Sequence, residues 1–297
     1  MPLQVTQFYE TEFAKNWEML VQQADSRFAG AVTTTSFMGR RKWFNQLSVG
    51  TMTEVVDRKG DTPDGDSTGL KYWIYRRKFE FVKVWDEDDE MQLDSIALPD
   101  SDEVASSVMA ENRTKDDVVI QAFGATRYIG ENGTDTDAFP SGQQIAVNYV
   151  YTGTAVNSGL TLPKLREAAR ILNVNEVPDS ERYIAVGARQ LDDMLATVEA
   201  TSRDYNDIQA LQSGKIKHFM GFEWINSQRL PVNTSTDIRT IYAWHKGGAK
   251  LADNGRNVHI DLLPGRRHAK QLRCVARMGA VRTENERVVS IACDQSP

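Results

Sequence analysis

The sequence contains few of the residues that build metal centres or disulfide frameworks. Among 297 residues there are two cysteines and four histidines, and they are not grouped at the spacing of a zinc site. Cys274 and Cys293 each lie in an apolar, strand-like segment. We therefore expect two buried, reduced thiols, and we expect no disulfide, no metal ion and no cofactor.

Long hydrophobic runs are also missing. No segment approaches the roughly 20 apolar residues that cross a bilayer, and the first ten residues contain no basic head followed by an apolar core. We expect a chain that is made in the cytosol and works without a membrane. The hydrophobic fraction of 40% and the charged fraction of 26% indicate a folded chain with a sizeable core.

The chain has no surplus of positive charge. Its net charge is −6, whereas phosphate neutralisation by Lys and Arg supplies much of the affinity of a dedicated nucleic-acid binder. Short basic clusters occur at residues 40–42, 76–78 and 266–270. We interpret them as exposed strand or loop ends, or as partners of an acidic neighbour.

Recognisable catalytic motifs are absent from the sequence. It has no G-x-S-x-G elbow, no H-E-x-x-H and no glycine-rich phosphate loop. Each histidine is interpreted as a structural residue, and no catalytic residue is predicted. An active site assembled from distant residues stays open as an alternative, because triads are recognised in space and not in sequence.

Two features of the first hundred residues predict surfaces that the chain does not cover by itself. Residues 6–25 place Phe13 and Trp17 on one apolar helical stripe, which must be buried on its own core or on a neighbour. The segment from there to Leu47 is expected to be an irregular, extended arm. Residues 49–85 then indicate a long hairpin with a polar tip at residues 60–69.

An isolated two-stranded ribbon is marginally stable in water, so the hairpin is expected to lie on a surface that need not belong to the same chain. Its legs are expected at residues 51–59 and 70–85. The five consecutive carboxylates at residues 86–90 are interpreted as a solvated turn and not as a metal site.

The rest of the chain alternates helices and strands. A long helix is expected from residue 100 or 101 to 125, with a polar middle at 111–117 that is exposed or lies against a polar partner. Thr161 and Pro163 predict the start of another helix. Strands are expected at 144–151, 182–188 and 217–226, and helices at 161–172, 190–200 and 205–212.

The order of these parts resembles the major capsid proteins of tailed bacteriophages with the Hong Kong 97-like fold. The most specific portions are residues 183–187 (YIAVG), 211–214 (LQSG) and 220–231 (MGFEWINSQRLP), and the closing residues 279–282 (GAVR) and 287–291 (RVVSI) also suit the family. The resemblance implies an α+β fold with five parts. These are an N-terminal arm (1–47), an extended E-loop hairpin (48–90), a P-domain with a long spine helix (91–154), an axial A-domain (about 155–265) and strands that return to the P-domain (266–297).

The resemblance implies a structural role in the virion and no enzymatic activity. The subunit is expected to assemble into pentamers and hexamers of an icosahedral head that encloses double-stranded DNA without sequence-specific binding. Expected partners are further copies of the chain, a separate scaffolding protein and a portal, and a decoration protein is left open. Lys59 and Lys71 flank the hairpin tip, but nothing around them supports a covalent cross-link.

The residues expected to contact neighbouring subunits lie in the arm and the hairpin. They are Phe13, Trp17, Lys59, Asp61, Asp64, Lys71, Trp73, Arg76, Arg77, Phe79 and Phe81. The alternatives are an encapsulin-like nanocompartment shell, another virion part such as a tail or adaptor protein, and an enzyme with a non-local active site.

Overall fold

The computed structural model describes residues 22–50, 52, 54, 69–85, 102–201 and 217–295. The chain divides into two compact units. Unit 1 comprises Met1–Asp25, Glu80–Arg113 and Asn257–Val275, and unit 2 comprises Ser26–Phe79, Thr114–Arg256 and Ala276–Pro297. No helix in the described part of the chain is long and apolar enough to span a bilayer.

The largest sheet of unit 2 has seven strands. In order they are β7 (Gln144–Ile145), β15 (Val288–Asp294), β12 (Ile238–His245), β8 (Arg182–Val186), β10 (Phe222–Asn226) and β9 (His218–Phe219), with β11 (Val232–Asn233) paired to β12. Strand β12 runs antiparallel to both β15 and β8, whereas β8 and β10 are parallel. The central strands are apolar along most of their length, which is typical of strands covered on both faces.

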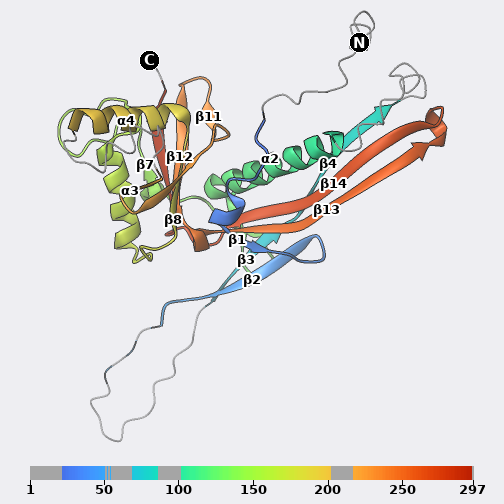
Figure 1. Ribbon diagram of the computed structural model, residues 1–297. Helices are drawn as coiled ribbons and strands as arrows, with labels where there is room; N and C mark the ends of the chain where they lie inside the picture. The colour runs from blue at the N-terminus through green and yellow to red at the C-terminus, as the bar shows by residue number, and fades with distance from the viewer. Residues whose placement is uncertain are drawn as a thin grey trace, which may run out of the picture. The chain divides into compact units, whose positions relative to one another are not determined.

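Two helices cover one side of this sheet, α3 (Leu162–Val174) and α4 (Ala188–Thr201) (Figure 1). Helix α3 buries Leu165, Ala168 and Leu172, whose spacing of three and four residues places them on one face. Pro163 lies in its first turn, as expected. Thr161 occupies the N-cap position, but its side chain makes no capping hydrogen bond, so the expected capping interaction is wrong.

Trp244 lies at the centre of the unit 2 core and is fully buried. Its ring stacks on Phe28 with centroids 5.7 Å apart, and it lies 4.6 Å from Phe123. The indole Nε1 donates a hydrogen bond to the Ala31 carbonyl oxygen, at 2.8 Å. The segment that follows residue 25 is therefore part of the core.

The expectation of an irregular arm up to Leu47 is consequently wrong for residues 26–47. This segment forms a 3-10 turn (Ala29–Ala31), β1 (Thr33–Thr35) and β2 (Arg41–Leu47). The expected helix at 6–25 falls almost wholly on residues 1–21, which lie outside the described residues, as do the acidic run at 86–90 and the expected helix at 205–212.

A four-stranded antiparallel sheet in unit 2 contains β2, β3 (Gly69–Tyr75), β5 (Arg127–Ile129) and β6 (Asp135–Asp137), in that order. The expected hairpin leg at 70–85 is not one strand. It breaks at Arg76, and β4 (Arg77–Trp85) joins a different sheet. Strand β3 pairs with β2, whereas the expected first leg at 51–59 lies mostly outside the described residues.

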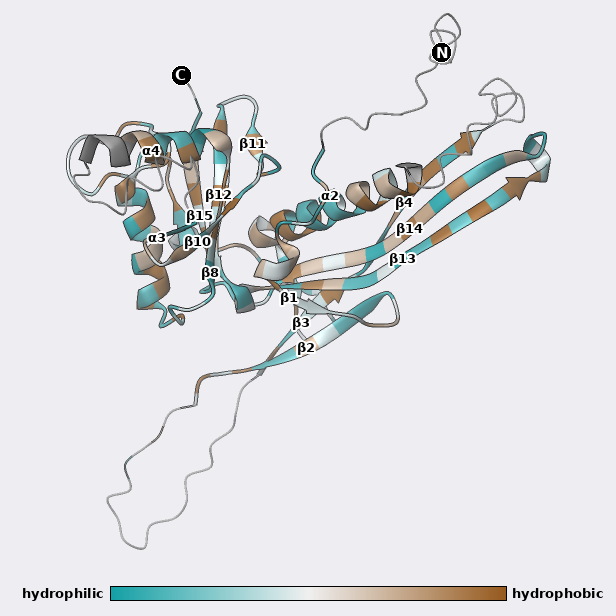
Figure 2. Ribbon diagram, in the orientation of Figure 1, coloured by the Kyte–Doolittle hydropathy of each residue, from teal (hydrophilic) through white to brown (hydrophobic). Residues whose placement is uncertain are grey.

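The third sheet has the order β1, β13 (Ala249–Leu263), β14 (Ala269–Arg282) and β4. Strands β13 and β14 alternate between hydrophobic and hydrophilic residues along much of their length (Figure 2). Helix α2 (Asp102–Gly124) has 23 residues and confirms the long helix expected from the sequence. In unit 1, Arg273 of β14 pairs with Glu80 of β4 at 2.8 Å, and Leu272 and Cys274 are buried.

The polar middle of α2 lies against a polar partner, which is one of the two arrangements expected for it. The Asp116 carboxylate is fully buried. It accepts hydrogen bonds from the Ser26 hydroxyl at 2.6 Å and from the backbone N–H groups of Arg27 and Phe28. This carboxylate therefore fixes the turn that leads Phe28 into the core.

Two expected strands are shorter in the structure. The expected strand at 144–151 is reduced to the two residues of β7, because the chain turns at once, with the Tyr149 N–H bonded to the Ala146 carbonyl. The expected strand at 217–226 splits into β9 and β10 around Met220 and Gly221, which both have positive φ. Both cysteines are free and buried, as expected.

Candidate assembly surface

Strands β2 and β3 form a two-stranded ribbon in unit 2, and residues 48–68 connect them. Its two strands pair over seven positions, from Arg41 opposite Tyr75 to Leu47 opposite Gly69. Strand β3 is enclosed between β2 and β5, and β2 forms an edge of the sheet among the described strands. Side chains of β2 are therefore mostly exposed, whereas three residues of β3 are buried.

One face of this ribbon carries two tryptophans on opposite strands. Trp73 is only 8% exposed, because its Nε1 donates to the Gly130 carbonyl at 2.8 Å and its ring lies against Gly133. A Cβ on Gly133 would come within 2.9 Å of that ring, and φ of Gly133 is +70°. Trp43, directly across the ribbon, is 48% exposed.

The expectation that its own chain leaves Trp73 uncovered is therefore wrong. The turn between β5 and β6 supplies the cover, and it also supplies the Glu131 carboxylate that lies 4.0 Å from the Lys71 ammonium. Lys71 in turn lies over the Trp43 ring, 5.4 Å from its centroid. The tryptophan that this face leaves exposed is Trp43, which the sequence analysis did not place among the contact residues.

The opposite face of the ribbon packs on β13. Phe44 stacks on Tyr72 with centroids 5.6 Å apart, and the Lys250 ammonium lies 4.1 Å from the Phe44 centroid. The same ammonium donates a hydrogen bond to the Tyr72 hydroxyl, at 3.1 Å. Ile74 is fully buried here in a small apolar cluster. The root of the ribbon is thus held firmly to its own subunit.

The ribbon becomes progressively uncovered away from this root. Large hydrophobic side chains with most of their surface in solvent occur at the end of β2 and in the residues that follow it. They are Leu47, Val49 and Met52. Such a group of exposed apolar side chains in a soluble protein is typical of a surface that a partner covers.

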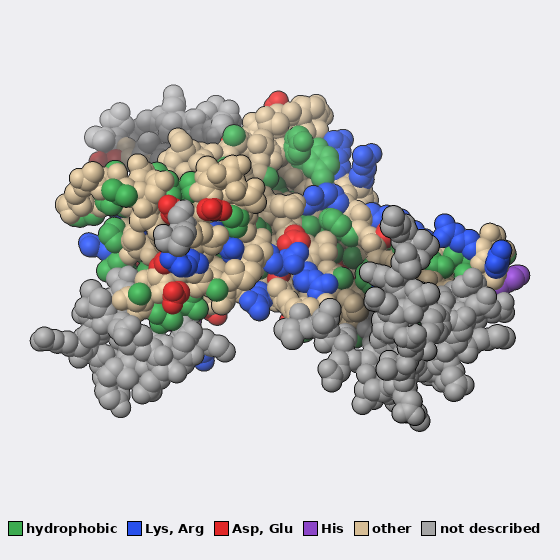
Figure 3. Space-filling view, turned by 90° about the horizontal axis from the view of Figure 1, so that it is seen from above, with side chains coloured by type: hydrophobic (Ala, Val, Ile, Leu, Met, Phe, Trp, Pro, Cys, Tyr) green, Lys and Arg blue, Asp and Glu red, His purple; other side chains and the backbone are tan. Residues whose placement is uncertain are grey.

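Two basic clusters that are distant in sequence meet at the base of the ribbon. The Arg76 N–H bonds to the Arg40 carbonyl oxygen at 3.0 Å, so Arg40 of one cluster lies beside Arg76 of the other. Arg77 donates to the Gln121 Oε1 at 3.3 Å. In the view from above, Lys and Arg side chains gather in groups on part of the surface with few acidic side chains among them (Figure 3).

The other expected contact residues divide into two groups. Phe79 and Phe81 are half-buried and alternate with exposed neighbours along β4, and Phe79 packs against the unit 2 core. The remaining five lie outside the described residues. They are Phe13, Trp17, Lys59, Asp61 and Asp64.

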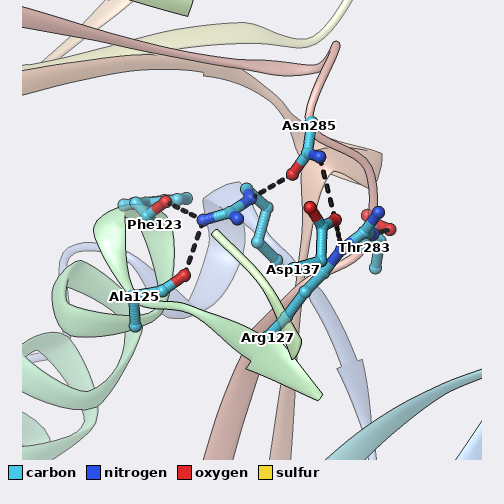
Figure 4. A network of polar contacts seen from close by, with 7 residues as sticks. Phe123, Ala125, Arg127, Asp137, Thr283 and Asn285 are labelled. Atoms are coloured by element: carbon cyan, nitrogen blue, oxygen red, sulfur yellow. Dashed lines mark hydrogen bonds and ion pairs between the residues drawn. The ribbon is translucent and has the colours of Figure 1, made fainter. Parts of the chain in front are cut away.

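A buried polar network links β5 and β6, and so the sheet that holds the ribbon, to the end of α2 and to β14 (Figure 4). The fully buried Arg282 guanidinium donates to the carbonyl oxygens of Phe123 at 2.7 Å and Ala125 at 2.8 Å, and to the Asn285 Oδ1 at 2.7 Å. Burial and the nearby Arg127 charge lower the pKa of Arg282 to about 10. Sequence reasoning missed this residue.

Asp137 on β6 is the anion of the network. Its Oδ2 accepts hydrogen bonds from the Arg127 Nε at 2.6 Å and from the Asn285 Nδ2 at 2.9 Å. Burial alone would raise the pKa of Asp137, but these two hydrogen bonds and the charges of Arg127 and Arg282 outweigh it, so the pKa lies below 3.8. Arg127 also donates to the Thr283 carbonyl oxygen, which ties β5 to the end of β14.

The features of this geometry that stand out are surfaces for contact. Within the described ranges, no group of three or more His, Cys, Asp or Glu side chains could hold a metal ion.

A sequence model of the phage capsid protein family matches residues 5–295. The chain belongs to the phage capsid protein family.

Solved structures of phage capsids have a similar fold. The capsid of cyanophage P-SCSP1u has a TM-score of 0.71 at 15% identity, over 98% of this chain and 94% of that chain. The capsid of Ralstonia phage GP4 has a TM-score of 0.69 at 8% identity, over 97% of this chain and 96% of that chain. A chain of Mycobacterium phage Che8 has a TM-score of 0.65 at 14% identity, over 95% of this chain and 98% of that chain. No curated protein matches this chain.

The resemblance noted in the sequence is therefore confirmed. The chain is a phage capsid protein with a mixed α+β fold, its role is structural, and its place is the virion. A capsid protein works by associating with copies of itself, so the exposed ribbon and its basic base are the candidate functional surfaces of this molecule.

Proposed function

We propose that this capsid protein forms pentamers and hexamers that close into the icosahedral head of a tailed phage around double-stranded DNA. The observation that carries the proposal is the β2–β3 ribbon, with its root fixed inside its own subunit and exposed apolar side chains beyond. Assembly in the host cytoplasm, with a separate scaffolding protein and a portal, belongs to the same proposal. A decoration protein is left open.

The parts of the Hong Kong 97-like arrangement can be assigned on this basis. We assign the E-loop to the ribbon of β2 and β3 with the connection between them, and the spine helix to α2. The seven-stranded sheet with α3 and α4 is assigned to the A-domain. This assignment differs from a continuous segment at 155–265, because β7 and β15 also belong to that sheet and β13 does not.

The ribbon supports assembly because it is fixed to its own subunit at one end and exposes apolar side chains at the other. Trp73, Tyr72 and Ile74 are buried at the root, so the direction in which the ribbon leaves the subunit is defined. Leu47 and the exposed residues beyond it gain burial when they lie on a neighbouring copy, at roughly 25 cal/mol per Å² of apolar area. Many such modest contacts, repeated over a closed shell, give a stable container.

The net charge of −6 is consistent with enclosing DNA without binding it tightly. The subunit would then hold the genome by surrounding it. Phe13, Trp17, Lys59, Asp61, Asp64, Lys71, Arg76, Arg77, Phe79 and Phe81 remain the proposed contact residues, and we add Trp43. For Trp73 we propose a structural role inside the subunit.

The test removes the connection between β2 and β3 and keeps the paired strands. Replacing residues 49–67 with Asn-Gly closes the hairpin just beyond the observed Leu47–Gly69 pair, with a turn suited to a tight hairpin. We expect a folded subunit, by circular dichroism and thermal unfolding, that no longer forms capsomers or polyhedral particles in size-exclusion chromatography and electron microscopy.

A matched control shortens a different exposed turn in the same way. Residues 234–237 connect β11 to β12, where Asn233 pairs with Ile238, and they can also be replaced with Asn-Gly. The control should assemble like the wild type. Normal particles from the ribbon variant would refute the role assigned to the ribbon, and a wild-type protein that stays monomeric under all assembly conditions would refute the proposed function.

A further inference from the structure

Four cationic residues lie at the base of the ribbon. Lys42 lies on the face of Phe44, because side chains alternate along β2, and Arg40 and Arg76 are paired through their backbones just before this strand begins. Lys250 reaches the same face from β13. The ammonium groups of Lys42 and Lys250 lie 5.1 Å and 4.1 Å from the centroid of the Phe44 ring. We call Arg40, Lys42, Arg76 and Lys250 the cation cluster.

The cation cluster has no counter-charge in the described part of its own subunit. None of its four side chains forms an ion pair there, and the hydrogen bond of Lys250 goes to the neutral Tyr72 hydroxyl. Like charges this close repel one another, and an anion would relieve the repulsion. The absence of ion pairs is notable in a chain with a net charge of −6.

The same sequence supplies a matching anion. Residues 86–90 (DEDDE) are five consecutive carboxylates, the densest charge run in the chain. They directly follow β4, which starts at Arg77 beside the cluster and extends for nine residues. At about 3.3 Å per residue, β4 carries the chain roughly 26 Å from its start, whereas the main chain of five extended residues spans about 18 Å, so pairing within one copy would require the whole run to turn straight back.

We propose that the cation cluster binds residues 86–90 of a second copy of this chain in the assembled shell. The inference rests on the proposed self-association and specifies one of its contacts. Arginine guanidinium groups pair with carboxylates through two parallel hydrogen bonds, and the lysine ammonium groups add charge without a fixed direction. Duplex DNA is the less favoured occupant, because the rest of a subunit with this net charge repels it.

The test is a charge exchange. Arg40 and Lys42 are both exposed and their side chains make no hydrogen bond to the described residues, so Arg40→Glu with Lys42→Glu is expected to leave the subunit folded. The opposite variant is Glu87→Lys with Glu90→Lys. Each pair of substitutions alone should raise the subunit concentration needed for assembly by about tenfold, since like charges then face each other. The four substitutions together should restore assembly to near the wild-type level.

The control places the same charge change elsewhere. Arg266→Glu with Arg267→Glu alters two exposed arginines in the turn between β13 and β14, and it should assemble as the wild type does. Higher salt should weaken assembly of the wild type more than that of the Arg40/Lys42 variant, because exposed charge pairs are screened.

Three results would overturn the inference while leaving the proposed function intact. The first is normal assembly of the Arg40/Lys42 variant. The second is failure of the combined variant to recover, although each pair alone is defective. The third is an Arg40/Lys42 variant that assembles normally but no longer binds a short DNA duplex, although the wild type binds that duplex. A wild type that forms neither capsomers nor particles would overturn the proposed function and the inference together.

Discussion

Gly279 of β14 lies directly against the backbone of Tyr75, where the chain leaves β3. A Cβ atom on Gly279 would come within 2.2 Å of the Tyr75 carbonyl oxygen and 3.4 Å of the Arg76 Cα. Only glycine permits two backbones to approach this closely. The contact lies where β3 ends in one sheet and β4 begins in another, so it determines how the ribbon connects to the rest of the subunit.

We predict that Gly279→Ala destabilises the subunit. The methyl group must displace backbone atoms, at a cost of about 1–3 kcal/mol for overpacking of this kind. Thermal unfolding of the unassembled protein measures the effect. Gly142→Ala is the matched control, because nothing lies within 4 Å of a Cβ at that position. Equal melting temperatures for the two variants would show that the backbone approach at Gly279 is not tight.

The two facing tryptophans give a second prediction, which separates folding from assembly. Trp73→Ala should lower the free energy of unfolding by about 3–5 kcal/mol, because a buried ring and its hydrogen bond to Gly130 are lost. Trp43→Ala should change it by less than about 0.5 kcal/mol, since the side chain is 48% exposed, and should instead impair assembly.

Chemical denaturation of the subunit and electron microscopy of assembly reactions provide the two readouts. The two variants serve as controls for each other, because they remove the same side chain from opposite strands of one ribbon. A Trp43→Ala variant that unfolds as easily as Trp73→Ala would mean that Trp43 stabilises its own subunit.

The helices were predictable from the sequence because their signals are local. The end of α2 carries Val118, Val119, Ala122 and Phe123 at helical spacing, and all four are buried. Pro163 marks the start of α3 for a similarly local reason, since its missing N–H has no partner to lose there.

The break in the expected strand at 70–85 could not be predicted in this way. The run continues through Arg76 without any glycine or proline. Gly279, which is about two hundred residues away in sequence, lies against the backbone at this break, and strand formation depends on such context more than on the residues themselves. Arg282 was missed for a related reason, because arginines are seldom fully buried and nothing local indicated that this one is.

The base of the ribbon was partly visible in the sequence. Trp43 and Phe44 face Trp73 and Tyr72 across the strands, and this mirrored order of aromatic residues, with a basic cluster at each outer end, indicates an antiparallel pairing. The expected first leg at 51–59 does not use this pairing, and residues 26–47 were expected to be irregular. Pairing the aromatic residues of 41–47 with those of 69–75 instead places Arg40 beside Arg76, as the backbone hydrogen bond between them shows.

A third prediction concerns acid. The pKa of Asp137 is below 3.8 in the folded protein, so its carboxylate adds stability at neutral pH that is lost as the pH falls through the folded pKa. Asp137→Asn should lose about 1–3 kcal/mol at pH 7, because Arg127 keeps a weaker acceptor and an uncompensated charge. The difference from the wild type should shrink well below pH 3.8.

Urea unfolding of the unassembled subunit at several pH values measures this difference. Asp135→Asn is a suitable control, because Asp135 is an exposed carboxylate on the same strand, β6. If the difference in the free energy of unfolding between Asp137→Asn and the wild type stayed constant across the acid range, the carboxylate charge would not be what stabilises the network.

The last prediction concerns Lys164, a fully buried lysine on α3. Its ammonium donates to the carbonyl oxygens of Ser158 at 2.7 Å, Gly159 at 2.9 Å and Ala292 at 3.0 Å, and so joins α3 to β15. Lys164→Met leaves these carbonyl groups without their donor, and we expect a loss of about 1–3 kcal/mol at pH 7.

Burial lowers the pKa of Lys164 from 10.5, so the unfolded chain keeps this proton at pH values where the folded protein has released it. The wild type therefore gains stability as the pH rises through the folded pKa towards 10.5, and the Met variant lacks that gain. The difference in the free energy of unfolding between the wild type and the Lys164→Met variant should increase at alkaline pH. Thermal unfolding at neutral and alkaline pH tests this, with Arg166→Met on the exposed side of the same helix as the control. A gap that narrows in alkali would mean that the charged form of Lys164 is the one the fold prefers.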